Sequence, residues 1–170
     1  PGETLIVVQA PEILLPPGFE AEMRATLVQM IAEGPVPRVA DARIVPLGRE
    51  DAEDMLELAT QTKPGPFTLR AQDFGPFWGI REKGRLIAMS GQRLGQPGFR
   101  ELSGVCTHPD VRGQGLGRLM SLYGMARIRE AGDVPYLHAY ATNTVAIGLY
   151  ESIGFRLRAH MNMAILRKVD

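Results

Sequence analysis

The 170-residue sequence predicts a mixed, predominantly antiparallel α/β sheet built as a single domain. Two observations lead to this prediction. Short apolar segments separated by Gly/Pro turns indicate strands that follow one another directly, and the later part of the chain alternates strands with amphipathic helices. The composition, with 45% hydrophobic and 22% charged residues, is typical of a globular protein with a full core.

Near the N-terminus, residues 5–8 (Leu-Ile-Val-Val) indicate a short buried strand. Two predictions stand side by side for residues 20–33. Their residue types favour a helix, but residues 18–33 resemble residues 154–169, since both begin Gly-Phe and then alternate charged and apolar residues. That alternation favours two strands that repeat a C-terminal hairpin.

From residue 42 the elements are easier to assign, because apolar periodicity and turn residues agree. Glu82-Lys83-Gly84 is a hairpin turn, Gly132 ends a helix, and Asn143 or Thr144 caps a short helix that stops at Gly154. The expected strands are 44–47, 77–81, 85–94, 99–107, 136–141, 155–160 and 162–168, and the expected helices are 49–60, 115–131 and the one that follows residue 143.

Charge and composition exclude several classes of protein. Nineteen Lys and Arg balance nineteen Asp and Glu, so the basic field that non-specific nucleic-acid binding needs is absent. No apolar run approaches the ~20 residues of a membrane span, and no signal-peptide pattern opens the chain. A single cysteine and three histidines without metal-ligand spacing predict no metal. We therefore expect a cytoplasmic protein that binds neither nucleic acid nor membrane.

The segment with the clearest chemistry is residues 105–118, where a strand runs through a glycine loop into a helix. Free amides and the partial positive charge at a helix N-terminus bind phosphate, and glycines let the ligand approach the backbone closely. A Walker A loop is excluded because no Lys-Ser/Thr pair follows, and a dinucleotide fingerprint because Arg118 or Met120 replaces its third glycine. What remains is Arg-x-x-Gly-x-Gly, with Arg112 and Gly115 as its first two fixed positions.

A second motif, Asn143 to Phe155 (NTVAIGLYESIGF), follows at a suitable distance. Together the two motifs resemble the GNAT superfamily of acyl-CoA-dependent N-acetyltransferases over about residues 42–168. The stretches 62–67 and 78–81 resemble an uncharacterised bacterial branch related to glycine N-acyltransferase-like proteins. We divide the chain into an N-terminal extension, residues 1–40, interpreted as the tail of a degenerate acyltransferase lobe, and a GNAT domain, residues 41–170.

The resemblance implies the GNAT fold, a twisted sheet splayed at its centre with helices on both faces, and acetyl-CoA as co-substrate. The pantetheine arm would pair with the strand before the glycine loop, and the pyrophosphate would lie on the loop amides. The implied binding residues are Val105, Cys106, Thr107, Arg112, Gly113, Gln114, Gly115, Leu116, Gly117, Arg118 and Asn143. Asn143 has a plain helix-capping role as its alternative, and Cys106 is interpreted as a small buried hydrophobe rather than a nucleophile.

Tyr150 matches the family tyrosine that protonates the departing CoA thiolate, a role that a phenol with a pKa near ~10 can fill. Two residues compete as general base: Glu101, on the strand that leads to Thr107, and His138, on the next strand. Without a bulge, Glu101 and Thr107 would point to the same face. A water chain is the third alternative for the base.

These observations predict an N-acyltransferase that moves acetyl from acetyl-CoA directly to a primary amine of an unidentified acceptor. The alternative is an acyl-CoA-binding sensor or structural module without turnover. Phe67, Phe77 and Trp78 are candidates for lining the acceptor pocket, and a homodimer is the assembly that the family implies.

Overall fold

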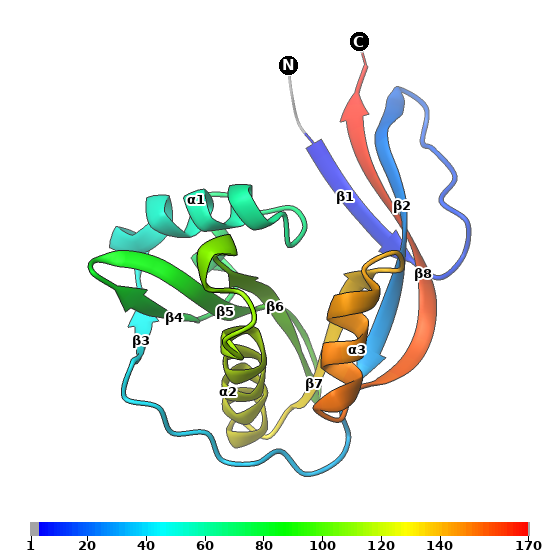
Figure 1. Cartoon of the computed structure of the whole chain (residues 1–170). Helices are drawn as coiled ribbons and strands as arrows, with labels where there is room; N and C mark the ends of the chain where they lie inside the picture. The colour runs from blue at the N-terminus through cyan, green and yellow to red at the C-terminus, as the bar shows by residue number, and fades with distance from the viewer. Residues whose placement is uncertain (1–3, 170) are drawn as a thin grey trace.

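The computed structural model describes residues 4–169, which form one eight-stranded sheet with three α-helices (Figure 1). The strands are β1 (Thr4–Gln9), β2 (Phe19–Ile31), β3 (Ile44–Leu47), β4 (Phe77–Glu82), β5 (Arg85–Gln96), β6 (Phe99–Thr107), β7 (Val134–Tyr140) and β8 (Arg156–Lys168). The helices are α1 (Ala52–Thr62), α2 (Leu116–Glu130) and α3 (Thr144–Ser152). No helix among these residues has the length and apolar character needed to cross a membrane.

The strand order is β1-β8-β2-β7-β6-β5-β4-β3, and only β6 and β7 pair in parallel within the described sheet. Their pairing is short: residues 99–101 of β6 meet residues 134–136 of β7. Beyond this point the two strands separate (Figure 1). The predictions of a mostly antiparallel sheet and of a splayed centre are both confirmed.

Helices cover both faces of the sheet, as predicted. In α1, Met55, Leu58 and Ala59 follow the i, i+3, i+4 spacing that gives a helix one apolar stripe. This stripe packs with Leu47 and Phe77 on one face. The opposite face is covered by α2 and α3, where Met125 and Ile128 of α2 are buried together with Ile153, the residue that follows α3. Each large side chain buried in these clusters contributes about 1.5–3 kcal/mol.

Residues 19–31 form the single strand β2, so both predictions for this segment are wrong in detail. The period-2 alternation outweighed helix propensity, because β7 and β8 supply partners on both sides of the strand. The expected break near residue 161 is also absent, since residues 160–162 continue to pair with residues 26–28. The two self-similar segments are therefore two long neighbouring strands, not two hairpins.

The extension is part of this sheet. β1 pairs with β8, and β2 lies between β7 and β8. In Figure 1, β1, β2 and β8 lie side by side and extend upward on the right of the view. That residues 1–40 derive from a degenerate lobe stays a prediction.

A bulge in β6 changes which side chains share a face. Ser103 pairs with Gly91 and Cys106 with Met89, so Gly104 and Val105 together oppose one residue of β5. Gly104 has a φ of 61°, which favours glycine. As a result Cys106 joins the cluster under α1, whereas Val105 packs against the cluster under α2 and α3.

Candidate active site

The glycine loop is built by backbone conformation. It runs from a 3-10 turn at Pro109–Val111 to the start of α2. Gly113 and Gly115 have φ values of 79° and 78°, and a Cβ added at either position would meet nothing within 4 Å. These glycines are therefore needed for their left-handed backbone and leave the loop open to a ligand.

The start of α2 offers amide donors beside this loop. The Leu119 amide donates to the Gly115 carbonyl, so the amides before it have no carbonyl one turn back in the helix. Arg112 and Arg118 are exposed, whereas the Leu116 side chain is only 4% exposed and belongs to the core. The residues present fit a pyrophosphate, which amide donors and nearby guanidinium groups would hold.

A cavity of about 170 Å³ occupies the gap where β6 and β7 separate. Its walls come mainly from β1, the loop after α1, the two separating strands and α3, with further side chains from β2, β5 and β8. Among its lining residues are Ile6, Val8, Leu27, residues 63–67, Arg93, Ser103, Gly104, Val105, His138, Tyr140, Asn143, Tyr150 and Met163. The structure thus brings four predicted site residues, Val105, His138, Asn143 and Tyr150, to one cavity.

Tyr150 projects from α3, where its ring packs edge-on against Phe155 at 5.8 Å between centroids. Burial raises the pKa of Tyr150 to about 12. The phenol therefore keeps its proton at neutral pH and is available as a donor. Asn143 caps α3, since its Oδ1 accepts a hydrogen bond from the Ala146 amide at 3.1 Å. Asn143 combines this capping role with a place in the cavity wall.

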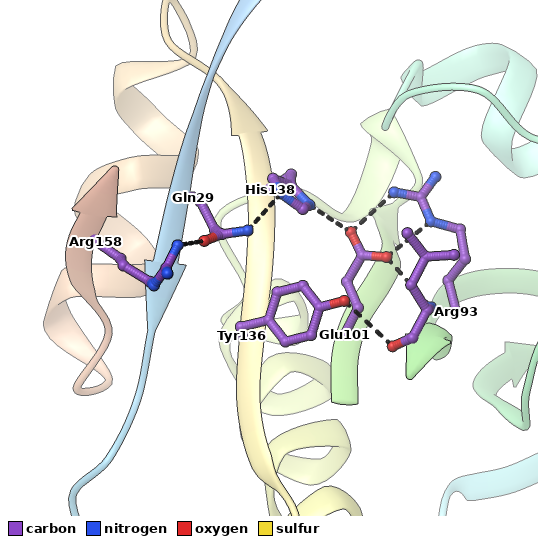
Figure 2. A network of polar contacts seen from close by, with 7 residues as sticks. Gln29, Arg93, Glu101, Tyr136, His138 and Arg158 are labelled. Atoms are coloured by element: carbon purple, nitrogen blue, oxygen red, sulfur yellow. Dashed lines mark hydrogen bonds and ion pairs between the residues drawn. The ribbon is translucent and has the colours of Figure 1, made fainter. Parts of the chain in front are cut away.

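Glu101 lies beneath the cavity and is only 1% exposed. Arg93 binds both of its oxygens at 2.9 Å, and Nδ1 of His138 lies 2.8 Å from Oε1 (Figure 2). Burial opposes ionisation of this carboxyl, but the hydrogen bonds from His138 and Arg93 outweigh burial and lower its pKa to about 2. In this arrangement Glu101 is an ionised partner of two other side chains.

His138 has hydrogen-bond partners at both ring nitrogens. Its Nδ1 faces Glu101, and its Nε2 lies 3.0 Å from Nε2 of Gln29 on β2. The Tyr136 ring packs edge-on against the imidazole at 5.8 Å between centroids. The two candidates for the general base are thus in direct contact, and only His138 of the two contributes to the cavity wall.

The remaining predicted residues lie on or beside β6. Thr107 approaches the helix start, since a Cβ at Gly117 would lie 3.4 Å from its Oγ1. The Cys106 thiol is buried, and burial raises its pKa to about 12, so it has no thiolate character at neutral pH. No group of three or more His, Cys, Asp or Glu side chains among residues 4–169 is arranged to hold a metal ion.

A larger cavity, of about 780 Å³, continues from the first one toward the loop before β4. Its walls are mainly apolar: Ile6, Val8, Pro66, Phe67, Ala71, Phe74, Phe77 and Leu94, with Thr68, Arg70, Asp73, Arg93 and Ser103 as the polar members. Of the predicted aromatic lining residues, Phe67 and Phe77 are present here. Trp78 instead packs against Tyr123 of α2, on the other face of the sheet.

Several residues of the site were not predicted from the sequence, because only the pairing of distant strands places them there. Arg93, Gln29 and Arg158 belong to no motif, and Ile6 and Val8 are adjacent to the site because β1 pairs with β8. The only available signal was the alternation in residues 18–33, which indicated a strand but not its partners.

The splayed sheet, the glycine loop at a helix start and the tyrosine beside the opening together define a protein of the GNAT fold class. Residues 77–164 match the model of the FR47-like protein family. The chain belongs to this family, within the GNAT superfamily of acyl-CoA-dependent N-acetyltransferases.

Similar proteins agree with this assignment. A crystal structure of a GNAT-family protein from Novosphingobium aromaticivorans is 43% identical with a TM-score of 0.92, and the match covers 98% of this chain and 75% of that one. The N-alpha-acetyltransferase RimI of Mycobacterium tuberculosis is 33% identical over 69% of this chain and 82% of its own length. A mycothiol acetyltransferase of Thermobispora bispora is 48% identical over 28% of this chain, which spans 16% of that protein.

Proposed function

We propose that this protein transfers an acetyl group from acetyl-CoA directly to a primary amine in a ternary complex. The observation that carries this proposal is the single cavity that joins His138, Asn143 and Tyr150 at the opening between β6 and β7. Relatives named as acetyltransferases support acetyl as the acyl group.

In this proposal the backbone of residues 105–107 binds the pantetheine arm, and the pyrophosphate rests on the amides from Gly113 to Arg118. The thioester then lies in the gap between the strands, within reach of Tyr150. A backbone amide at the bulge can stabilise the negative charge that develops on the thioester oxygen.

The amine must lose a proton before it attacks, because a free amine with a pKa near ~10 arrives mostly protonated. We assign proton acceptance to the imidazole of His138, reached directly or through water, with Glu101 holding the ring. The nitrogen attacks the thioester carbon, the C–S bond breaks, and Tyr150 donates its proton to the departing thiolate. Its pKa of about 12 ensures that this proton is present at neutral pH.

The larger cavity indicates which amines fit. Its apolar walls suit an amine with an aliphatic or aromatic body. Of the cations on the two walls, Arg93 is paired with Glu101 and Arg70 with Asp73, so Lys63 leaves the lining with a net positive charge. We therefore expect polyamines and lysine-rich peptides, which carry further positive charges, to be poor acceptors.

The test measures CoA release across a panel of amines, corrected for hydrolysis without acceptor. Acceptor-dependent release, strongest with monoamines that carry an apolar group, is the expected result. Tight acetyl-CoA binding without release for any amine would overturn the proposal and support the binding module instead.

A further inference from the structure

A row of polar side chains crosses five neighbouring strands at the site (Figure 2). It runs from Arg93 on β5 through Glu101 on β6, His138 on β7 and Gln29 on β2 to Arg158 on β8. All five residues lie outside the glycine loop and the Tyr150 motif. Gln29 comes from the N-terminal extension and precedes the residues that match the family model.

The chemistry of Arg158 and Glu101 determines the direction of every hydrogen bond that lies between them in the row. Nη1 of Arg158 lies 2.5 Å from Oε1 of Gln29, and a guanidinium can only donate, so this oxygen accepts. The Gln29 amide group must therefore present its NH₂ to Nε2 of His138, 3.0 Å away. On the other side of the imidazole ring, the ionised Glu101 can only accept, so Nδ1 of His138 donates to it.

These directions leave one neutral form of the ring: a proton on Nδ1 and a lone pair on Nε2. We propose that Gln29, oriented by Arg158, is the positioning residue that donates to the lone pair of Nε2, while Glu101 keeps the proton on Nδ1. The catalytic consequence rests on the proposed function, in which Nε2 accepts the proton of the amine. The tautomer itself does not depend on it.

The NH₂ of Gln29 occupies the lone pair of Nε2, so the amide has to turn away before Nε2 can take up a proton. After half a rotation the amide presents Oε1 to the imidazolium, so two N–H groups do not face each other. Arg158 is exposed and becomes hydrated when it loses this partner, and Nδ1–H stays on Glu101 throughout. Gln29 therefore alternates between donating to the base and accepting from its protonated form.

The imidazole ¹⁵N signals of the free protein test this inference, since the chain has only three histidines to assign. At about pH 8.5 we expect a protonated Nδ1 and an unprotonated Nε2 for His138. Gln29→Leu should keep this form, which Glu101 holds, but should move the Nε2 signal, because Nε2 loses its hydrogen-bond donor. Gln29→Glu, whose carboxylate can only accept, should protonate both nitrogens.

Arg158→Met provides a variant that acts from the exposed end of the row without disturbing the core. It should also move the Nε2 signal, because the Gln29 amide is then free to turn. Arg156→Met is the matched control: Arg156 is an exposed arginine on the same strand that pairs with Glu33 instead. A protonated Nε2 in the wild type, or an unchanged Nε2 signal in both Gln29→Leu and Arg158→Met, would overturn the proposal.

Activity gives a second, separable measurement. We expect kcat to fall about tenfold in Gln29→Leu, a fraction of the 10²–10⁴ that base catalysis supplies, with the KM for acetyl-CoA unchanged. If wild-type protein acetylates no amine while His138 shows the Nδ1–H form, the proposed function fails and the positioning role of Gln29 stands. Normal kcat in a Gln29→Leu protein whose Nε2 signal has moved would remove the catalytic consequence.

Discussion

The carboxylate of Glu101 and the imidazole of His138 form one buried pair, with Oε1 2.8 Å from Nδ1, at the point where β6 and β7 separate. The sequence presents these residues as rivals for the role of general base. In the structure they are partners, and Arg93 holds the carboxylate from its other side. A change at either residue therefore alters the surroundings of the other.

Glu101→Gln should destabilise the protein near neutral pH and have less effect in acid. The folded-state pKa of about 2 lies below the ordinary 4.5, so the ionised carboxylate contributes stability above pH 4.5 that is lost as the pH falls toward 2. At about 1.4 kcal/mol per pKa unit, this contribution is on the order of 3 kcal/mol.

Urea unfolding of both proteins at pH 7, 5 and 3 checks this prediction. The gap between wild type and variant should narrow steadily from pH 5 to pH 3. Glu33→Gln, which removes an exposed pair with Arg156, serves as the control and should cost less than about 1 kcal/mol. A gap that stays constant with pH would contradict the ionised, buried state of Glu101.

Tyr150→Phe should lower kcat by about a hundredfold or more, while the Kd for acetyl-CoA stays within about twofold. The phenol donates a proton that phenylalanine lacks, but the two rings fill the same space beside Phe155. Because its pKa is raised to about 12, ionisation of Tyr150 should cause no loss of wild-type activity below about pH 10.

Steady-state kinetics and calorimetric titration with acetyl-CoA measure the two quantities. Tyr123→Phe is the matched control, because Tyr123 sits on α2 and packs against Trp78 on the other face of the sheet. Unchanged turnover in Tyr150→Phe would remove Tyr150 from the mechanism.

Gly115→Ala should weaken acetyl-CoA binding more than it weakens folding. Its φ of 78° strains any side chain by about 1–2 kcal/mol, and the added methyl group projects into the open space beside the helix amides. We expect a loss of affinity of at least tenfold.

Gly132→Ala separates backbone strain from ligand contact. Gly132 has a φ of 88°, also faces open space, and lies beyond the other end of α2. The two variants should lose similar stability on thermal unfolding, but only Gly115→Ala should lose affinity for acetyl-CoA. Equal affinity in both would contradict the assignment of the loop to the pyrophosphate.

Much of the fold could be predicted from the sequence because local signals agreed there. The glycine loop, the cap at Asn143 and the turn at residues 82–84 all combine turn residues with apolar periodicity, and the elements beside them lie where expected. Residues 20–33 could not be assigned in this way. Their helix propensity opposed their alternation, and the outcome depended on β7 and β8, which lie more than 100 residues away.

The residues of the site divide in the same way, into those that local sequence signals predict and those that they do not. The residues of its two motifs could be predicted, because each motif is defined by neighbouring residues in the sequence. Arg93, Gln29 and Arg158 could not, because they reach the site only through the register of β5, β2 and β8 across the sheet. The bulge at Gly104 was also beyond sequence reasoning, although it separates the face of Glu101 from that of Thr107.

Ile6→Ser should raise the KM for an apolar amine while leaving the Kd for acetyl-CoA unchanged. Ile6 lines both cavities from β1, opposite the loop after α1. At about 0.8 kcal/mol per buried CH₂, removing two to three carbons from the wall costs about 2 kcal/mol of acceptor binding, or some tenfold or more in KM.

Leu5→Ser is the matched control, since Leu5 precedes Ile6 on the same edge strand and points to the opposite face. The two side chains are similarly exposed, at 47% for Leu5 and 49% for Ile6, so both substitutions should have similarly small effects on stability. A raised KM in Ile6→Ser alone would place the acceptor against β1 and give the N-terminal extension a direct part in substrate selection. Equal KM values in both variants would mean that the acceptor binds without touching β1, and the apolar preference would then have to come from Phe67, Phe74 and Phe77 on the opposite wall.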